Sequence, residues 1–125
     1  MTKFYIASLF SEREQSAEIA NQIEERLGWV NVARWVKGGE EGLLRHQIAD
    51  LDLEDVNAAD VFIVISHPRG TPKPGGGRWV EFGYALARGK WTFVIGPYEN
   101  VFTHHEDVKV YPTVDCFLSD LEVQK

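Results

Sequence analysis

The sequence has little of the sulfur and of the basic charge on which several classes of protein depend. Its 125 residues include one cysteine, Cys116, so neither an internal disulfide nor a cysteine-rich metal framework can form. Its 13 Lys and Arg stand against 19 Asp and Glu, which gives a net charge of -6. We expect no nucleic-acid polymer as a partner, because binding its phosphates needs clustered basic side chains. A small phosphorylated ligand, which needs only a few local donors, stays open.

Long apolar runs are missing as well. No stretch approaches the roughly 20 apolar residues of a membrane span, and the apolar run within residues 1–10 is too short for a signal peptide. We therefore expect no membrane partner and a cytoplasmic location. A length of 125 residues with 44% hydrophobic residues is ordinary for one compact domain, here residues 1–125.

Short apolar runs alternate with segments of helical periodicity along most of the chain. The predicted strands span residues 4–9, 29–36, 61–65, 91–95 and 108–111. The predicted helices run from Ser11, which forms a capping-box pattern with Glu14, to Gly28, and over residues 43–59, 79–88 and 114–121. Apolar strands between helices favour a parallel sheet covered on both faces. The sequence thus predicts a single-domain α/β fold of the flavodoxin-like type, with a doubly wound parallel sheet in three layers. In its 2-1-3-4-5 strand order, ligands bind at the carboxyl ends of strands one and three.

A glycine-rich loop leads into the helix predicted at residues 79–88. Its glycines would let the backbone approach a ligand closely, beside the free N–H groups of the helix start: Gly75, Gly76 and Gly77. Glu81 falls in the predicted first turn, where a carboxylate is stabilised as the anion that a nucleophile must be. Acidic residues also occur in first turns only because they stabilise the helix. Three basic side chains around the loop could hold a phosphate or keep the loop soluble: Arg69, Lys73 and Arg78.

Two aspartates lie on the apolar side of the helix predicted at residues 43–59. Asp52 and Asp55 share that side with four apolar residues: Leu44, Ile48, Leu51 and Ala59. A carboxylate on a core-facing stripe costs free energy unless it is paired or lines a cavity, so both are candidates for a site. Alternatively, Asp52 caps a new helix that begins at Leu53, and Asp55 lies in its first turn.

Two carboxylates in different environments are the usual catalytic residues of enzymes that break a glycosidic bond. One attacks or stabilises the anomeric carbon and the other handles the proton at the leaving group, so the reaction needs no metal. The segment His104-His105-Glu106-Asp107 has the residue types of a metal site, but neighbouring side chains point apart and no further ligands are spaced to complete it. We expect neither a metal nor a cofactor. Cys116 stands in an apolar stretch and is expected in the core.

Three segments of the sequence carry a resemblance to a known family. They are Phe4-Tyr-Ile-Ala-Ser8 at the first strand, Asp52-Leu-Glu-Asp-Val-Asn-Ala-Ala-Asp60 before the third strand, and Trp79-Val-Glu-Phe-Gly-Tyr-Ala-Leu-Ala-Arg-Gly-Lys90. Together they resemble the nucleoside 2-deoxyribosyltransferase-like superfamily, which includes the 2'-deoxynucleoside 5'-phosphate N-hydrolases. The resemblance extends to about Phe102. It implies a flavodoxin-like fold and an enzyme that acts on a deoxynucleoside or its 5'-monophosphate.

The resemblance also implies roles for matching residues. Glu81 matches the nucleophile that forms a covalent 2-deoxyribosyl-enzyme, Asp52 the aspartate that assists at the base and sugar, and Tyr5 the tyrosine that holds the nucleophile. Trp35 and Trp79 could stack on a base. The expected substrate contacts are Ser8, Asp55, Gly75, Gly76, Gly77, Arg78 and Trp79.

Three functions are compatible with these residues. The first is cleavage or transfer of an N-glycosidic bond in a nucleoside or nucleotide through Glu81. The second is a non-catalytic module that senses a nucleotide, and the third is hydrolysis of another N-glycoside, such as a ribonucleotide or NAD. Asn100 lies too near the fourth strand to match the Asn-containing segment with which the transferases reach a neighbouring subunit, so hydrolysis demands less of this chain than base exchange. Self-association, as a homodimer or higher homo-oligomer, is expected from the resemblance.

Overall fold

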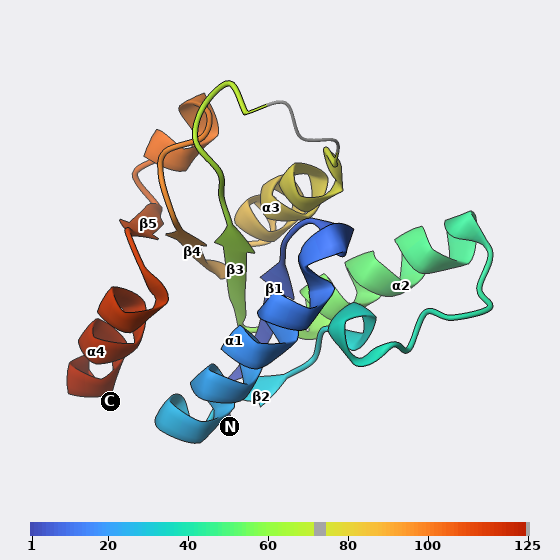
Figure 1. Cartoon of the computed structure of the whole chain (residues 1–125), viewed down its shortest axis with the longest axis horizontal. Coiled ribbons are helices and arrows are strands. Elements are labelled where there is room, and N and C mark those ends of the chain that lie inside the picture. Colours follow the sequence, from blue (N-terminus) through green and yellow to red (C-terminus); the bar gives the residue numbers. More distant parts are fainter. Residues whose placement is uncertain (72–74, 125) are drawn as a thin grey trace.

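A five-stranded parallel sheet forms the centre of the computed structural model, which describes residues 1–71 and 75–124 (Figure 1). The strands are β1 (Lys3–Ala7), β2 (Val30–Asn31), β3 (Val61–Ile65), β4 (Trp91–Ile95) and β5 (Val108–Tyr111). They lie in the order β2-β1-β3-β4-β5, and every neighbouring pair is parallel. The predicted strand order and the flavodoxin-like α/β class are therefore confirmed.

Helices cover both faces of the sheet. On one face α1 (Arg13–Leu27) packs beside α4 (Val114–Gln124), and on the other α2 (Arg45–Ala58) packs beside α3 (Gly77–Ala87) (Figure 1). Short 3₁₀ helices lie in the connections of the described residues: η1 (Phe10–Glu12), η2 (Arg34–Lys37) and η3 (Val101–His104). No helix within residues 1–71 and 75–124 combines the length and the apolarity needed to cross a membrane.

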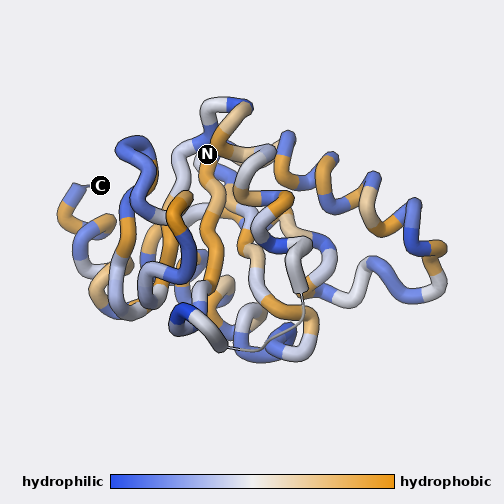
Figure 2. The backbone as a smooth tube through the Cα atoms, turned by 90° about the horizontal axis from the view of Figure 1, so that it is seen from above, coloured by the Kyte–Doolittle hydropathy of each residue, from blue (hydrophilic) through white to orange (hydrophobic). Residues whose placement is uncertain are grey.

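The central strands are apolar because both of their faces are covered. The strand β3 has the sequence VFIVI, and its first four residues are buried. Figure 2 shows these strands as apolar segments between more polar helices. In the register of β1 and β3, Tyr5 lies opposite Phe62, and their rings stack with centroids 5.8 Å apart. The side of the sheet that faces α3 thus has an aromatic floor in which one ring, that of Tyr5, carries a hydroxyl group.

The strand predicted at residues 29–36 is mostly wrong. Only Val30–Asn31 pairs with β1, and residues 34–37 form η2 instead. The Trp35 indole N–H donates to the Ile6 carbonyl at 2.8 Å, and Gly38 ends the turn with a φ of 78°. The aromatic and β-branched residues that favoured a strand are thus buried by a tertiary contact, which overrides the local preference.

Two further expectations about local structure are corrected. Ser11 does not cap α1, because the Glu12 N–H bonds to the Leu9 carbonyl at 2.8 Å and places Ser11 inside η1. Cys116 is exposed, not in the core. The helix α4 turns other residues toward the sheet, namely Phe117, Leu118 and Leu121.

The helix α2 is continuous from Arg45 to Ala58, so Asp52 does not cap a new helix at Leu53. Its first turns project beyond the sheet (Figure 1), and Leu44, predicted to face the core, is 62% exposed. Within the helix only Asp55 and Val56 are buried. The apolar side of this helix therefore covers the core near its carboxyl end and borders open space near its amino end.

Asp55 ties α2 to η2. Its carboxylate accepts the Arg34 backbone N–H at 3.0 Å and the Arg34 Nε–H at 2.9 Å, and Asp55 is 5% exposed. We predict that Asp55→Ala lowers the free energy of unfolding by about 1–3 kcal/mol, because it leaves a partly buried N–H without an acceptor. Urea denaturation followed by circular dichroism measures the change.

The matched control is Glu54→Ala, which removes the neighbouring carboxylate. Glu54 bonds the same guanidinium at 3.2 Å, but its side chain is 72% exposed, so its loss is expected to cost less than about 0.5 kcal/mol. Equal losses for the two variants would contradict the structural role of Asp55.

Candidate active site

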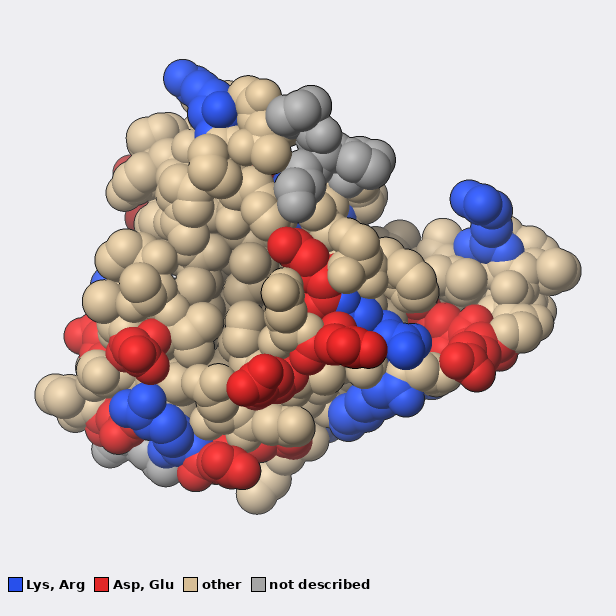
Figure 3. All heavy atoms as spheres, in the orientation of Figure 1, with Lys and Arg blue, Asp and Glu red and all other residues tan. Residues whose placement is uncertain are grey.

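Two adjoining pockets open between α2 and α3 at the carboxyl end of β1. The outer pocket has a volume of about 650 Å³ and the inner pocket about 450 Å³, which suits a small organic ligand. Figure 3 shows a notch between the body of the protein and the outer end of α2, on a face where acidic and basic side chains are interspersed. Five residues line both pockets: Arg45, Ile48, Asp52, Gly77 and Glu81.

The two pockets differ in their walls. The outer pocket is mostly apolar, with walls formed by Leu43, Ile48, Ala49, Leu53 and Val80. The inner pocket reaches the sheet, and its walls combine aromatic rings with polar groups: Tyr5, Ser8, Phe10, Trp35, Glu40 and Arg78. A flat aromatic ligand group with polar edges matches the inner pocket better, because it can stack on rings and still find hydrogen-bond partners.

Glu81 lies at the junction of the two pockets. Its Oε2 accepts a hydrogen bond of 2.9 Å from the Tyr5 hydroxyl. The helix α3 begins at Gly77, so Glu81 is in the second turn and the prediction of a first-turn position is wrong. The helix start is too far away to be the main source of stabilisation for this carboxylate, since that effect fades beyond the first turn. The Tyr5 hydroxyl, and not the start of the helix, donates the hydrogen bond that stabilises this carboxylate.

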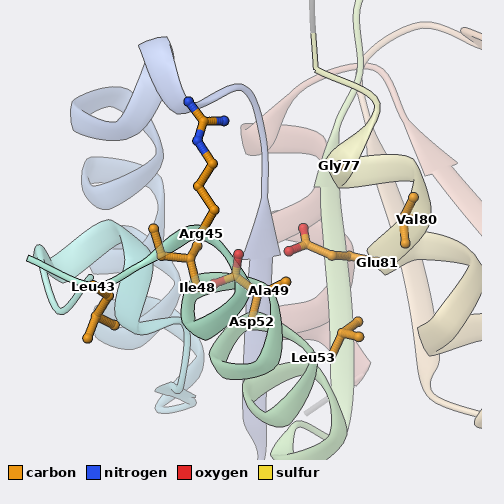
Figure 4. A pocket seen from close by; sticks show the side chains of 9 residues that line it. All are labelled: Leu43, Arg45, Ile48, Ala49, Asp52, Leu53, Gly77, Val80 and Glu81. Carbon is orange, nitrogen blue, oxygen red and sulfur yellow. The ribbon is translucent and has the colours of Figure 1, made fainter. Parts of the chain in front are cut away.

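Asp52 faces Glu81 across the gap between the two helices. Figure 4 shows the Asp52 carboxylate on α2 and the Glu81 carboxylate on α3 pointing toward one another. Burial raises the pKa of Glu81 from 4.5 to about 7, while the Tyr5 hydrogen bond works in the opposite direction. Burial also raises the pKa of Asp52, and the charge of Glu81 adds to the rise. The structure thus brings together Tyr5, Asp52 and Glu81, as the sequence predicted.

Two further residues of this site were not predicted from the sequence. Glu40 lies in the loop between η2 and α2 and lines the inner pocket, and Arg45 at the start of α2 lines both pockets. Connections that follow a strand of a parallel sheet lie at its carboxyl edge, so the loop after β2 could have been placed near the site. The sequence does not indicate which of the neighbouring Glu40 and Glu41 turns inward.

Some of the predicted substrate contacts do lie at the pockets. The Ser8 hydroxyl lines the inner pocket and shares a 2.5 Å hydrogen bond with Ser16. Gly75 has a φ of 113°, and a Cβ there would come within 2.8 Å of Leu9 Cδ2, so a side chain would both strain the backbone and clash. Gly77 lines both pockets, whereas Gly76 lines neither.

Arg78 and Trp79 belong to a different cluster. The Arg78 guanidinium forms a bidentate pair with Glu99, at 2.9 and 2.8 Å, and the Trp79 indole N–H donates to Glu99 at 3.0 Å. Burial raises the pKa of Glu99, but the hydrogen bonds outweigh it and lower the pKa overall. The guanidinium predicted to bind a phosphate is thus neutralised by Glu99 and fixes the start of α3. Trp79 is likewise held by Glu99 and lines neither pocket.

A further candidate, Asp55, lies outside both pockets. Asp55 is occupied by Arg34 and lines neither pocket, so the structure does not place it with the substrate contacts. Lys73 lies outside the described residues. Across residues 1–71 and 75–124, no group of three or more His, Cys, Asp and Glu side chains has an arrangement that could hold a metal ion.

We predict that Glu81→Gln stabilises the fold at alkaline pH. Because the folded state raises the pKa of Glu81, this group favours folding fully below pH 4.5, and that contribution is lost as the pH rises through about 7. The neutral amide avoids the loss. At pH 8 the free energy of unfolding of the variant should exceed that of the parent by up to about 3 kcal/mol. At pH 5 most of this difference should be lost.

Urea denaturation at both pH values measures this difference, and Glu14→Gln on the exposed side of α1 is the control. The same difference at pH 5 and pH 8 would show that burial of the Glu81 charge does not cost folding free energy.

Several solved structures have the same fold as this chain. No family model and no curated protein matches the sequence. Among solved structures, a CMP N-glycosidase from Clostridium botulinum is similar with a TM-score of 0.66 and 20% identity, over 98% of this chain and 99% of that one. A 2-desoxiribosyltransferase from Leishmania mexicana has a TM-score of 0.71 and 15% identity, over 98% of each chain. A conserved protein from Enterococcus faecalis V583 has a TM-score of 0.76 and 18% identity, over 100% of this chain and 99% of that one. The chain therefore shares its fold, over nearly its whole length, with a CMP N-glycosidase and a 2-desoxiribosyltransferase, as the resemblance to the nucleoside 2-deoxyribosyltransferase-like superfamily implied.

Proposed function

We propose that this protein is an enzyme that cleaves or transfers the N-glycosidic bond of a nucleoside or its 5'-monophosphate, with Glu81 as the nucleophile. The observation that carries the proposal is the Glu81 carboxylate, held by the Tyr5 hydroxyl at 2.9 Å and faced by Asp52 in a pocket of ligand size. The fold shared with a CMP N-glycosidase and a 2-desoxiribosyltransferase supports the same chemistry. A module that only binds a nucleotide has no need of this combination.

The first step is attack by Glu81 on the anomeric carbon. Tyr5 binds Oε2, which leaves Oε1 to form the bond to C1'. As that bond forms, the bond from C1' to the base nitrogen breaks and its electron pair leaves with the base. The transition state carries positive charge on the sugar, and the carboxylates around the pocket stabilise that charge.

The second step releases the sugar from Glu81. Water attacks C1' of the glycosyl-enzyme and regenerates the carboxylate, with overall retention of configuration, or a second base attacks in place of water. Water can enter the pocket that the base has left, whereas transfer requires the site to bind a second base. Hydrolysis is therefore the simpler outcome for the residues that line this site.

The sugar and phosphate ends of the substrate have candidate partners as well. Arg45 borders both pockets and is exposed, so it can bring positive charge to a 5'-phosphate. The first turn of α3, behind Gly75, offers backbone N–H groups for the same purpose. The CMP N-glycosidase among the similar structures makes a ribonucleotide a second substrate class to test beside deoxynucleotides. Self-association and a cytoplasmic location remain predictions from the resemblance and the composition.

We predict that the protein releases free base from a mixed pool of nucleosides and nucleotides and that Glu81→Gln lowers the rate by at least about 10³-fold, because an amide does not serve as the nucleophile. Liquid chromatography of the released bases, with and without an added acceptor base, separates hydrolysis from transfer. Circular dichroism confirms that the variant is folded.

Two results would contradict this assignment. Full turnover by the Glu81→Gln variant would exclude Glu81 as nucleophile. Thermal stabilisation of the parent protein by a nucleotide, with no base released on long incubation, would show a binding module instead.

We predict that the activity falls as the pH drops below about 7, because Glu81 must be ionised and burial raises its pKa to about that value. Tyr5→Phe removes a hydrogen bond that lowers the pKa of Glu81, so the acidic limb of the pH profile should move to higher pH. At pH 6 the variant should be about tenfold less active than the parent, with a smaller gap at pH 9. A profile of kcat/KM that drops by the same factor at every pH would mean that Tyr5 acts only on packing.

A further inference from the structure

Glu40 is the third carboxylate of the inner pocket and has no part in the reaction described above. It lies on the loop between η2 and α2, so it approaches the site from a different segment than Asp52 and Glu81. Trp35 and Phe10 line the same part of the pocket, where a flat base would stack. Glu40 is half-buried, and it is therefore placed at the edge of a ligand and not in open solvent.

The oxygens of Glu40 and Asp52 have an unusual environment. Glu40 Oε2 and Asp52 Oδ1 are both buried, and neither has a hydrogen-bond partner among the described residues. Ionised carboxylates accept hydrogen bonds but donate none, so neither of these two could satisfy the other. Their negative charges would also repel. A single proton turns one of them into a donor and removes both problems.

The surrounding charges decide where that proton resides. Burial is the largest cause that raises the pKa of Glu40, followed by the neighbouring carboxyl group of Asp52 and by the negative charges of Asp52 and Asp55. Arg34 lowers it, but this guanidinium is already paired with Asp55. The other charged groups that line the pockets around Glu40 are Arg13, Glu41, Arg45, Arg78 and Glu81. Of these, Arg78 is paired with Glu99.

We propose that Glu40 and Asp52 share one proton and that Glu40 is the acid that delivers it to the departing base. The inference rests on the proposed function and adds a catalytic residue to it. It also names the substrate class: nucleosides whose base leaves poorly as an anion and needs a proton, as the unmodified pyrimidines and purines do.

The proton balance closes over the two steps. When the C1'–N bond breaks, its electron pair goes to the base and the Glu40 proton binds a ring nitrogen or the carbonyl oxygen conjugated with it. The pair is then left as two carboxylates. In the second step water attacks C1', the bond to Glu81 Oε1 breaks, and the proton lost by the water returns to the Glu40–Asp52 pair.

The test is Glu40→Gln assayed on 2'-deoxyuridines that differ at position 5, with hydrogen, fluorine or a nitro group, as nucleosides and as 5'-monophosphates. Electron withdrawal makes the base a better leaving group and removes its need for a proton. We expect Glu40→Gln to slow kcat for the unsubstituted base by about 10²-fold or more and to leave the nitro compound within a few-fold of the parent. The pH profile of the variant should also lose its alkaline limb.

The matched control is Glu41→Gln, which removes a neighbouring exposed carboxylate and should respond to the base in the same way as the parent. An equal loss for all three bases by Glu40→Gln would overturn the inference and assign Glu40 to packing. If the folded parent protein releases no base from these compounds or from the mixed pool of nucleosides and nucleotides, the proposed function fails instead, so the two failures are distinct.

Discussion

The hydrogen bond between the Tyr5 hydroxyl and Glu81 is the interaction on which the site depends. A carboxylate placed against the aromatic floor of the sheet loses most of its hydration, and the Tyr5 hydroxyl on β1 compensates Glu81 for part of this loss with a hydrogen bond. Because Tyr5 is fully buried and stacked on Phe62, that donor is held rigidly. Burial raises the pKa of Glu81 to about 7, and the Tyr5 hydrogen bond limits that rise. The carboxylate is therefore partly ionised at neutral pH and able to attack a carbon. Its burial costs folding free energy, which is typical of a residue kept for function.

The sequence predicted this fold because apolar runs such as VFIVI at residues 61–65 leave little choice other than a buried parallel strand. It failed where a distant contact decides the local structure. Residues 34–37 have the composition of a strand, yet the Trp35 indole reaches the Ile6 carbonyl and winds them into η2. The prediction that Ser11 caps the first helix is wrong for a related reason. The turn closed by the hydrogen bond between Leu9 and Glu12 begins before Ser11 and includes it. Periodicity describes a segment in isolation, and these residues are governed by partners elsewhere in the chain.

The same limit explains which site residues could be predicted. Tyr5, Asp52 and Glu81 converge because strand order alone brings the segments that carry them to one edge of the sheet. Asp55 and Arg78 looked equally suited to a ligand, but Arg34 and Glu99 bind them, and no pattern in the sequence pairs these residues. Glu40 was missed because a loop has no periodicity from which to infer the direction of a side chain.

These pairings also set the charge of the pocket. Two arginines near the site are neutralised, Arg34 by Asp55 and Arg78 by Glu99, so their positive charge is directed away from Glu81. Among the described residues that line both pockets, Arg45 is the basic side chain at the mouth, while carboxylates occupy the interior. A site that had evolved to bind an anion at its centre would be built the other way round. An acidic interior with a cation at its rim suits a substrate whose phosphate stays at the entrance and whose reacting carbon becomes positively charged inside, which is the charge pattern of N-glycosidic cleavage in a nucleotide.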